Sequence, residues 1–409
     1  MTGEATDSLL SPATIAALGG EVLKGIRVLD LGAFITGPYA AMLLADLGAE
    51  VVKVEPPNGG DPFRGFDSGG YSPAYQAHNR NKLSVSLDYR TPEGLEILER
   101  LARTADVLVI NSRPGVPERG GYGPKRMAEI NPNLIYCQIT GFGPVGPYAQ
   151  RPAFDNVGQA LSGWLTLFQM GGDPRVAGPA VCDAVTGLFA AYGVLGALFE
   201  RARTGRARLV EVNMVEAMLA FASEPIIRYR ATGTVSGPFS RAAMSQAFAL
   251  TCRDGLGLGI HLSSPEKFWT ALMKAIDAPE VAEDSRFLTR QGRVDHYNEL
   301  AFALKAVFAR RDRAEWLARL EASDVPFAPI HDVSRLAEDP HLETLQTFYT
   351  DHHPERGEVA GINRPVYYDG NRDISRRPPP VLGENSSEIL RELGISEATE
   401  ASLRKRGVV

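Results

Sequence analysis

The sequence predicts an α/β fold in which a parallel β-sheet forms the larger domain and a smaller α+β domain follows. Two patterns lead to this prediction. Over the first third of the chain, short apolar segments typical of strands alternate with segments of helical periodicity, which indicates successive βαβ units. From about residue 246 onward, the pattern changes to one strand pair and several amphipathic helices. A chain of 409 residues has room for about two or three domains.

The elements of the larger domain follow from these segments in chain order. Strands are expected at 26–32, 49–55, 83–88, 106–111 and 134–140, and helices at 37–48, 91–105 and 123–131. The helix at 91–105 has the clearest beginning, because Thr91 is a favourable N-cap residue and Pro92 suits the first helical position. Parallel strands joined through helices require right-handed crossover connections.

The second half of the chain predicts a different architecture. A helix is expected at 184–202, a strand and a long helix within 207–233, an antiparallel pair at 248–262 and amphipathic helices at 266–276, 298–311 and 313–323. The Asp254-Gly255 dipeptide is a typical hairpin turn for that pair. The domain boundaries predicted are 1–225 for the large domain, 226–334 for the small domain and 335–409 for a C-terminal segment that returns to the large domain.

Composition excludes several classes of function. The net charge is −6 and no Lys/Arg run is present, so the chain has no electrostatic footprint for nucleic acid. Cys137, Cys182 and Cys252 are too few for a disulfide scaffold, and no pair has the spacing of a zinc site. Reduced thiols fit a cytoplasmic location. No uninterrupted apolar run reaches 18 residues, so we expect no membrane span.

The first strand–helix junction, DLGAFITGPYA, is a candidate ligand site because parallel sheets bind ligands at the carboxyl ends of their strands. It is not a dinucleotide-binding G-x-G-x-x-G motif, and the chain has no P-loop motif. Its Gly-Pro pair opens either a plain turn or an anion-binding helix start. Arg90, Arg113 and Arg119 lie near strand ends, where they form either a solvated basic face or a phosphate site.

The stretch GPAVCDAVTG, residues 178–187, places Asp183 among small and apolar residues just before a long apolar helix. One interpretation is an N-cap, in which the carboxylate accepts hydrogen bonds from the first turn. The other is a nucleophile, since a carboxylate positioned at a helix N-terminus stays ionised and can attack a carbonyl carbon. The two roles are compatible.

Several stretches together make the chain resemble the class III CoA-transferases, a family that includes formyl-CoA transferase, carnitine CoA-transferase and 2-methylacyl-CoA racemase. The resemblance extends from about Gly25 to Val409. The matching stretches, in chain order, include GIRVLDLGAFITGPYAAMLLADLGAEVVKVEPPNGGDPFRG, NRNKLSVSLD, TADVLVINSRPG, NPNLIYCQITGFGPVGPYAQRPAFDNVGQALSG, RARTGRARLVEVNMVEAML, SDVPFAPIHDV and PPPVLGENSSEILRELG. Each stretch alone is weak evidence for the family, but seven such stretches in the same order are specific to it.

The resemblance implies a Rossmann-like large domain built from both chain ends, a small domain, and two chains interlocked like rings. It implies that Asp183 is the covalent nucleophile, so the resemblance favours the nucleophile over the N-cap as its main role. The implied CoA and acyl-group contacts are Phe34, Ile35, Thr36, Leu87, Arg90, Asn111, Ser112, Arg113, Arg119, Phe154 and Asp155. Arg90 and Arg119 are the expected partners of the CoA phosphates.

The implied reaction moves CoA from an acyl-CoA donor, succinyl-CoA being one candidate, to a carboxylic acid. It requires no metal and no cofactor other than CoA itself as substrate. Because an unpaired aspartate has a pKa near 3.9, no separate base is expected to ionise the nucleophile. The expected assembly is an interlocked homodimer, with a heteromer as the alternative. Arg228, Arg230, Arg241 and His261 form either a site for a dicarboxylate acceptor or ordinary exposed charge.

Two other functions are compatible with the resemblance. A racemase would need a catalytic histidine where this chain has Phe154, and an acidic residue near Ser264. A CoA-binding subunit without activity would not need Asp183. The residues present therefore favour the transferase.

Overall fold

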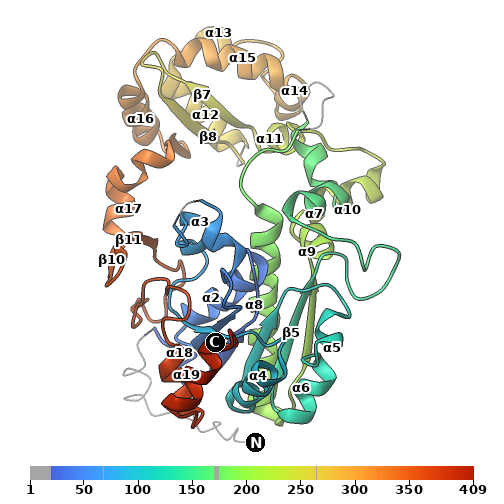
Figure 1. Ribbon diagram of the computed structural model, residues 1–409. Coiled ribbons are helices and arrows are strands. Elements are labelled where there is room, and N and C mark those ends of the chain that lie inside the picture. Colours follow the sequence, from blue (N-terminus) through green and yellow to red (C-terminus); the bar gives the residue numbers. More distant parts are fainter. Residues whose placement is uncertain (1–19, 68, 170–174, 264) are drawn as a thin grey trace, which may run out of the picture. The chain divides into compact units, whose positions relative to one another are not determined.

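The computed structural model describes residues 20–67, 69–169, 175–263 and 265–409, and these fold into two compact units. The first unit consists of the described residues up to Trp164, together with Val176–Ser223 and Phe348–Val409. The second consists of the described part of Leu165–Arg175 and of Glu224–Thr347. Figure 1 labels the helices and strands of both units.

A six-stranded, all-parallel sheet forms the centre of the first unit, in the order β3-β2-β1-β4-β5-β6. The strands are β1 (Arg27–Asp30), β2 (Glu50–Glu55), β3 (Lys82–Ser86), β4 (Val107–Ile110), β5 (Ile135–Thr140) and β6 (Leu209–Asn213). This confirms the parallel α/β prediction. The strand order reverses between β1 and β4, which is where open parallel sheets bind their ligands.

Helices cover both faces of the sheet, so its inner strands are buried on both sides, and β4 is apolar and buried at all four of its residues. One face buries Leu29, Val52 and Leu108 against side chains of α4, α6, α18 and α19. The other face buries Val28 and Val107 against α2 and α8. The helices of this unit are α2 (Thr36–Ala45), α3 (Pro73–Gln76), α4 (Pro92–Thr104), α5 (Val116–Arg119), α6 (Pro124–Ile130), α7 (Asp155–Leu161), α8 (Val181–Thr204), α9 (Met214–Phe221), α18 (Ser386–Glu392), α19 (Glu397–Lys405) and the 3₁₀ turn η1 (Pro62–Gly65).

Helix α4 begins as its sequence predicts. The Thr91 hydroxyl accepts a hydrogen bond from the Gly94 N–H, and Pro92 occupies the first turn, where a missing N–H costs nothing. The helix carries a strong apolar stripe that buries Ile97, Leu98 and Leu101 in the sheet core. The capping residues and the core packing therefore both favour a helix that begins at Pro92.

The C-terminal residues lie in this first unit. Ile389 and Leu390 of α18 and Leu403 of α19 are buried in the same core cluster as β1 to β3. The Ser86 N–H at the end of β3 donates to the Ser386 hydroxyl at 3.0 Å. The antiparallel hairpin of β10 (Phe348–His353) and β11 (Gly357–Ile362) precedes them and was not predicted.

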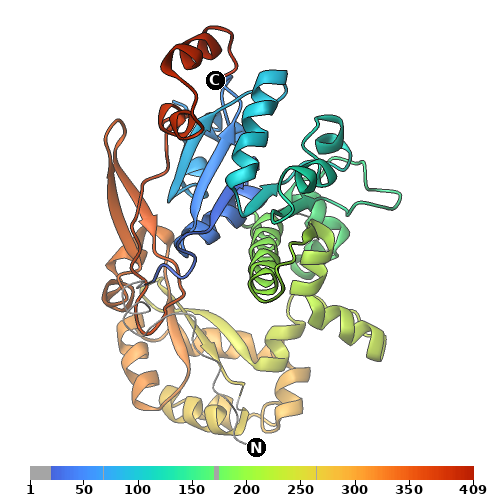
Figure 2. The same cartoon turned by 90° about the horizontal axis from the view of Figure 1, so that it is seen from below.

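Helix α8 is the one helix among the described residues that is long and apolar enough to cross a membrane, with 24 residues and a mean hydropathy of 1.7. This helix was not predicted as a membrane-span candidate, because charged and polar residues interrupt its apolar sequence. Half of its most apolar stretch is buried, and Ala190, Val194 and Ala197 pack into the core between α2 and the sheet. Helix α8 is seen from the side in Figure 1 and end-on, in green, in Figure 2.

The second unit is built around a three-stranded antiparallel sheet, β7-β8-β9, formed by β7 (Ala247–Thr251), β8 (Gly257–His261) and β9 (Phe327–Ile330). The predicted pair around Asp254-Gly255 is confirmed as β7 and β8. Strand β9 was missed because it is only four residues long and contains Pro329, which weakens a strand pattern.

Helices cover one face of this smaller sheet, where Leu272, Phe308 and Trp316 are completely buried. The helical segments of the unit are η2 (Trp164–Phe168), α10 (Ser223–Thr232), α11 (Ser240–Ser245), α12 (Pro265–Ile276), α13 (Pro279–Ala282), α14 (Arg290–Asp295), α15 (Tyr297–Phe308), α16 (Arg313–Ala322), η3 (Val333–Glu338) and α17 (Pro340–Thr344).

A buried ion pair joins the carboxyl end of β2 to the C-terminal part of the chain. The guanidinium of Arg64 donates two hydrogen bonds of 2.7 Å to the carboxylate of Glu55, and a third of 3.1 Å to the Pro380 carbonyl. Both charged side chains are 2% exposed. A planar guanidinium satisfies a buried carboxylate through paired bonds, which offsets the cost of removing both groups from water.

Replacing Arg64 with alanine leaves the buried Glu55 carboxylate without the guanidinium that is hydrogen-bonded to it. We expect Arg64→Ala to lower the free energy of unfolding of the first unit by about 3–5 kcal/mol. The measurement is the urea midpoint followed by circular dichroism. Arg126→Ala is the control, because Arg126 is half-exposed in its pair with Glu99 and the urea midpoint should hardly change. Equal midpoint shifts for both variants would contradict this account.

Candidate active site

The turn between β1 and α2 lies at the point where the strand order reverses, and Asn111 holds it there. Asn111 follows β4, and its amide oxygen accepts a hydrogen bond of 2.9 Å from the Ala33 N–H. Its amide nitrogen donates to the Ala33 carbonyl at 2.6 Å and to the Thr36 hydroxyl at 2.9 Å. One side chain therefore fixes the turn from the neighbouring strand.

The next residue in the turn, Phe34, has a φ of +63°, a conformation that bulky side chains rarely adopt. Its N–H donates to the Asp61 carboxylate at 3.1 Å. Asp61 pairs with the fully buried Lys53 at 2.9 Å, and Lys53 donates to the Gly32 carbonyl at 2.9 Å. A strained backbone conformation persists where the surrounding structure holds it in place, and these bonds hold Phe34 in this conformation.

Two buried lysines, Lys53 and Lys82, and two buried aspartates, Asp30 and Asp61, lie beneath this turn. Burial opposes the charge on Lys53, but Asp30 and Asp61 hold its pKa above the ordinary value. Burial lowers the pKa of Lys82 to about 8, although the ammonium donates to Asp30 at 2.8 Å. Burial also opposes the charge on Asp30, but Lys53 and Lys82 hold its pKa below the ordinary value. The turn thus rests on a network of compensating charges.

Asp183 is in the first turn of α8, but it does not cap the helix. The N-cap position is Ala180, which makes no side-chain capping bond. The carboxylate of Asp155 fills that role, accepting hydrogen bonds from the N–H groups of Cys182 at 2.8 Å and Asp183 at 3.1 Å. The predicted capping role of Asp183 is therefore wrong, because its side chain starts one turn too far along the helix.

The Asp183 carboxyl group titrates far from its ordinary value. Burial, with a smaller contribution from the negative charge of Asp155, raises its pKa from 3.8 to about 7. The sequence analysis expected a pKa near 3.9 and an aspartate that is fully ionised at neutral pH. In this structure the side chain is poised between its two protonation states near pH 7.

A cavity of about 400 Å³ opens at the carboxyl ends of β1, β4 and β5, and Asp183 lines it. Eight of the predicted residues meet there: Phe34, Ile35, Thr36, Asn111, Ser112, Arg113, Phe154 and Asp183. The ring of Phe154 is 60% exposed and meets the Phe34 ring edge-on, at 5.5 Å between centroids. The cavity therefore combines aromatic walls, helix N-termini and one carboxyl group.

The other predicted residues do not line this cavity. Asp155 lies behind Asp183, on the backbone of α8. Leu87 is completely buried in the core of the sheet, so its side chain serves packing rather than ligand contact. Arg90 is exposed and binds the Asp88 carboxylate through bonds of 2.7 and 3.0 Å. Arg119 is exposed at the end of α5 and makes no ion pair with any residue of the described chain.

Arg151, Thr140 and Met214 also line the cavity and were not predicted as site residues. The guanidinium of Arg151 stacks over the ring of Tyr148, with its central carbon 4.0 Å from the ring centroid. All three follow or end β5 and β6, whose carboxyl ends share the ligand-binding edge of the sheet. Extending that edge rule to the last two strands would have identified Thr140 and Met214, whereas Arg151 lies well beyond the end of β5 and has no such signal.

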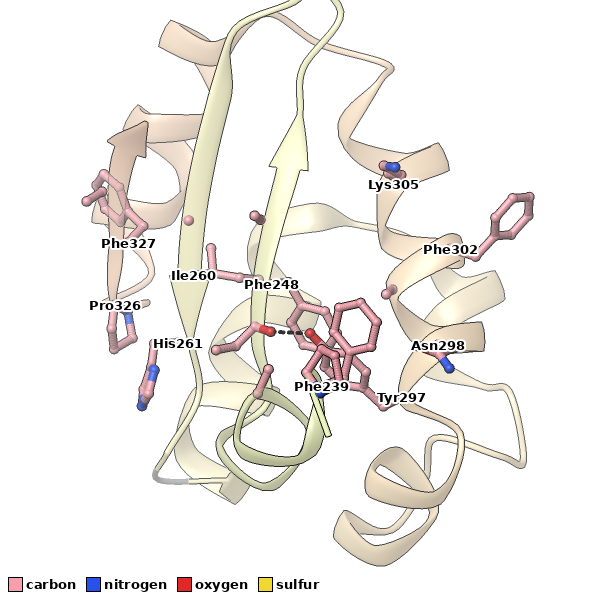
Figure 3. A pocket seen from close by; sticks show the side chains of 17 residues that line it. Phe239, Phe248, Ile260, His261, Tyr297, Asn298, Phe302, Lys305, Pro326 and Phe327 are labelled. Atoms are coloured by element: carbon pink, nitrogen blue, oxygen red, sulfur yellow. Dashed lines mark hydrogen bonds between the residues drawn. The ribbon is translucent and has the colours of Figure 1, made fainter. Parts of the chain in front are cut away.

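The second unit has a larger cavity of about 950 Å³, shown in Figure 3. His261 on β8 and Phe302 and Lys305 on α15 line it, together with the rings of Phe248 and Tyr297. It is mainly apolar, and the Tyr297 hydroxyl donates to the Ala247 carbonyl at 2.6 Å.

Of the residues predicted to bind an acid, only His261 lines this cavity. Arg228 and Arg241 instead share the carboxylate of Glu224, at 3.6 and 3.3 Å. Arg230 is exposed on α10. Ser264 lies outside the described residues.

Comparison with known proteins gives a consistent result. Residues 23–386 match CoA-transferase family III. The chain belongs to the family III CoA-transferases. It is 33% identical to succinyl-CoA:glutarate CoA-transferase of Homo sapiens, over 95% of this chain and 90% of the human protein. It is 32% identical to succinyl-CoA–D-citramalate CoA-transferase of Chloroflexus aurantiacus, over 95% and 98%.

Solved structures agree with this assignment. The enzyme resembles Rv3272 from Mycobacterium tuberculosis, with a TM-score of 0.79, 30% identity and coverage of 91% of this chain and 100% of that one. A CAIB/BAIF family protein from Brucella suis gives a TM-score of 0.78 at 30% identity, with coverage of 91% and 99%. Within the described ranges of the enzyme, no three His, Cys, Asp or Glu side chains are grouped so as to hold a metal ion.

The raised pKa of Asp183 predicts a pH-dependent difference in stability between the wild-type enzyme and Asp183→Asn. The folded state holds the Asp183 proton more tightly than the unfolded chain, so this group's stabilisation is complete below about pH 3.8 and is lost as the pH rises through about 7. Asparagine does not titrate, so Asp183→Asn should gain stability relative to wild type across that interval. Urea midpoints measured at several pH values test this, and parallel curves for the two proteins would contradict it.

Proposed function

We propose that the enzyme transfers CoA from an acyl-CoA donor to a carboxylic acid through covalent intermediates on Asp183. The observation that carries this proposal is a carboxylate at the start of a long helix, facing a cavity at the switch point of a parallel sheet. The site requires no bound metal or redox cofactor, because the carboxylate itself can act as the nucleophile.

The proposed steps conserve the thioester. The Asp183 carboxylate attacks the donor thioester carbonyl, the C–S bond breaks, and a mixed anhydride and CoA thiolate form. The thiolate then attacks the Asp183 carbonyl carbon, which gives an aspartyl thioester and releases the donor acid. The acceptor carboxylate attacks that thioester, and the returning thiolate takes the acceptor acyl group and restores Asp183.

The donor and acceptor proposed are dicarboxylic. The human and Chloroflexus relatives are named as succinyl-CoA transferases acting on glutarate and D-citramalate. Two exposed arginines, Arg113 and Arg151, line the cavity of this enzyme, and a guanidinium binds a carboxylate well. The predicted acid site at Arg228, Arg230, Arg241 and His261 receives less support, because Arg228 and Arg241 are already paired with Glu224.

A homodimer, interlocked in the manner of the family, is the proposed assembly, and a cytoplasmic location is proposed with it. Support for a dimer comes from the outer face of α8, where Leu188, Tyr192 and Phe199 are 55%, 73% and 65% exposed. Their spacing places them on one side of the helix. A second copy of the chain would remove this apolar stripe from water. A heteromer stays the alternative.

Acylation of Asp183 is the first test of the proposed function. Incubation with succinyl-CoA followed by hydroxylamine or borohydride should modify the peptide that contains Asp183 and no other, because only an activated acyl group reacts with these reagents. Asp183→Ala should show no modification and no turnover. Full turnover by Asp183→Ala, or modification elsewhere in the wild type, would refute the nucleophile.

Arg119→Ala tests whether this exposed side chain binds a CoA phosphate. A phosphate contact is made equally in the ground and transition states, so KM for CoA esters should rise while kcat is nearly kept. Loss of a charge-assisted bond worth about 1.5–3 kcal/mol corresponds to a rise of about 10- to 150-fold in KM. Arg126→Ala, another exposed arginine, is the control. An unchanged KM would show that Arg119 does not contact CoA.

Proton exchange separates transfer from racemisation. A two-base racemase needs an ionisable group on each face of the α-carbon, and Phe154 supplies none at the position expected for a histidine. In D₂O the enzyme should therefore leave the α-hydrogen of a 2-methylacyl-CoA in place, with no deuterium entering the α-position. NMR of the substrate reports this, and rapid exchange with inversion would contradict the transferase proposal.

A further inference from the structure

Asp155 is the first residue of α7, yet its carboxylate completes a different helix. One oxygen accepts the hydrogen bonds from the N–H groups of Cys182 and Asp183, at 2.8 and 3.1 Å. The other oxygen accepts a bond of 2.5 Å from the amide of Gln159, which is 1% exposed. Each carboxylate oxygen therefore has a partner, and the side chain has one defined orientation.

The α8 helix depends on this contact at its beginning. Its own N-cap residue, Ala180, has no side-chain acceptor, so Asp155 is the side chain that satisfies donors of the first turn. One of the two bonded N–H groups belongs to the residue whose side chain faces the cavity. The position of Asp155 consequently sets the backbone from which the Asp183 carboxyl group extends.

We propose that Asp155 is a positioning residue for the Asp183 nucleophile, holding the start of α8 and placing a second negative charge beside the attacking carboxylate. The inference rests on the proposed function, because it assumes that Asp183 is acylated. It assigns Asp155 no contact with CoA or the acyl group, which differs from the role implied by the family resemblance.

The negative charge of Asp155 lowers the free energy of acylating Asp183. Two carboxylates that share one helix start repel each other, and forming an anhydride or thioester on Asp183 removes one of the two charges. Acylation is therefore favoured relative to a site in which Asp183 has no negative neighbour. The N-terminus of a helix stabilises an anion, and repulsion from Asp155 offsets part of that stabilisation at Asp183. The free Asp183 carboxylate is therefore more nucleophilic than it would be without Asp155.

The other groups around Asp183 do not replace this effect. Burial and Asp155 are the two influences that raise its pKa. Burial, followed by the charges of Asp155 and Asp183, raises the pKa of the neighbouring Cys182 thiol to about 12, so the thiol stays neutral. Arg113 and Arg151 line the same cavity from the β4 and β5 sides and are exposed. Gln159, which orients Asp155, carries no charge.

Asp155→Asn separates the two parts of the proposal, because its amide oxygen can still accept the two backbone bonds while the charge is lost. The expected result is that the ascending limb of kcat/KM against pH, near pH 7 in the wild type, moves to lower pH. The trapped fraction of acyl-enzyme at steady state should fall, with KM for acyl-CoA nearly kept. Asp155→Glu keeps the charge but misplaces the oxygens, so its limb should stay near pH 7 while kcat falls by up to about a hundredfold.

The adjacent exposed residue gives the control variant, Asn156→Ala, which should behave as wild type in each of these measurements. Circular dichroism and melting curves establish that each variant is folded. If Asp155→Asn does not fold, the pH limb and kcat of Asp155→Glu decide the proposal. A pH limb for Asp155→Asn identical to wild type, or a kcat for Asp155→Glu identical to wild type, would overturn it. Wild-type enzyme that is never acylated at Asp183 would instead refute the proposed function itself.

Discussion

The hydrogen bonds between Asn111 and the turn after β1 are the constraint on which the site depends. They join the two strands between which the strand order reverses, and they leave Phe34 in a left-handed conformation that the ion pair of Lys53 and Asp61 supports from below. With the turn fixed, α2 begins at the cavity and its first residue, Thr36, lines it. A looser turn would leave the cavity without one wall.

The charged groups beneath the turn also connect the site to the distant end of the chain. Glu55 at the end of β2 binds Arg64, and Arg64 reaches the carbonyl of Pro380. Side chains of α18 and α19 then complete the core on one face of the sheet. Residues far apart in the sequence thus stabilise the same edge of the sheet, which explains why so many buried charges are tolerated there.

Local patterns predicted the elements well, and long-range contacts explain what they missed. Thr91 and Pro92 predict the start of α4 correctly, because helix capping depends on a few neighbouring residues. Strand β9 is too short and too proline-rich to be seen without the two strands it joins. Leu87 resembles a ligand contact by position, but the packing of the core decides that it is buried.

The site shows the same division between local and long-range information. Six of the eight predicted residues that meet at the cavity come directly after β1 or β4 of the parallel sheet, whereas Phe154 and Asp183 are placed there by the starts of α7 and α8. The role of Asp155 could not be read from its neighbours in the sequence, since it acts on a helix more than twenty residues away. Nor could the raised pKa of Asp183, because burial depends on the folded surroundings rather than on the residue type.

The transfer of one oxygen atom tests the central claim most directly. In the proposed mechanism, the acceptor carboxylate contributes the bridging oxygen of the second anhydride, and that oxygen remains on Asp183 when the new thioester departs. A single turnover with excess enzyme, succinyl-CoA and ¹⁸O-labelled glutarate should therefore leave one ¹⁸O in the peptide that contains Asp183 and none in the released succinate. Label in the released succinate, with none in that peptide, would show that the two acids react directly and that Asp183 is not the nucleophile.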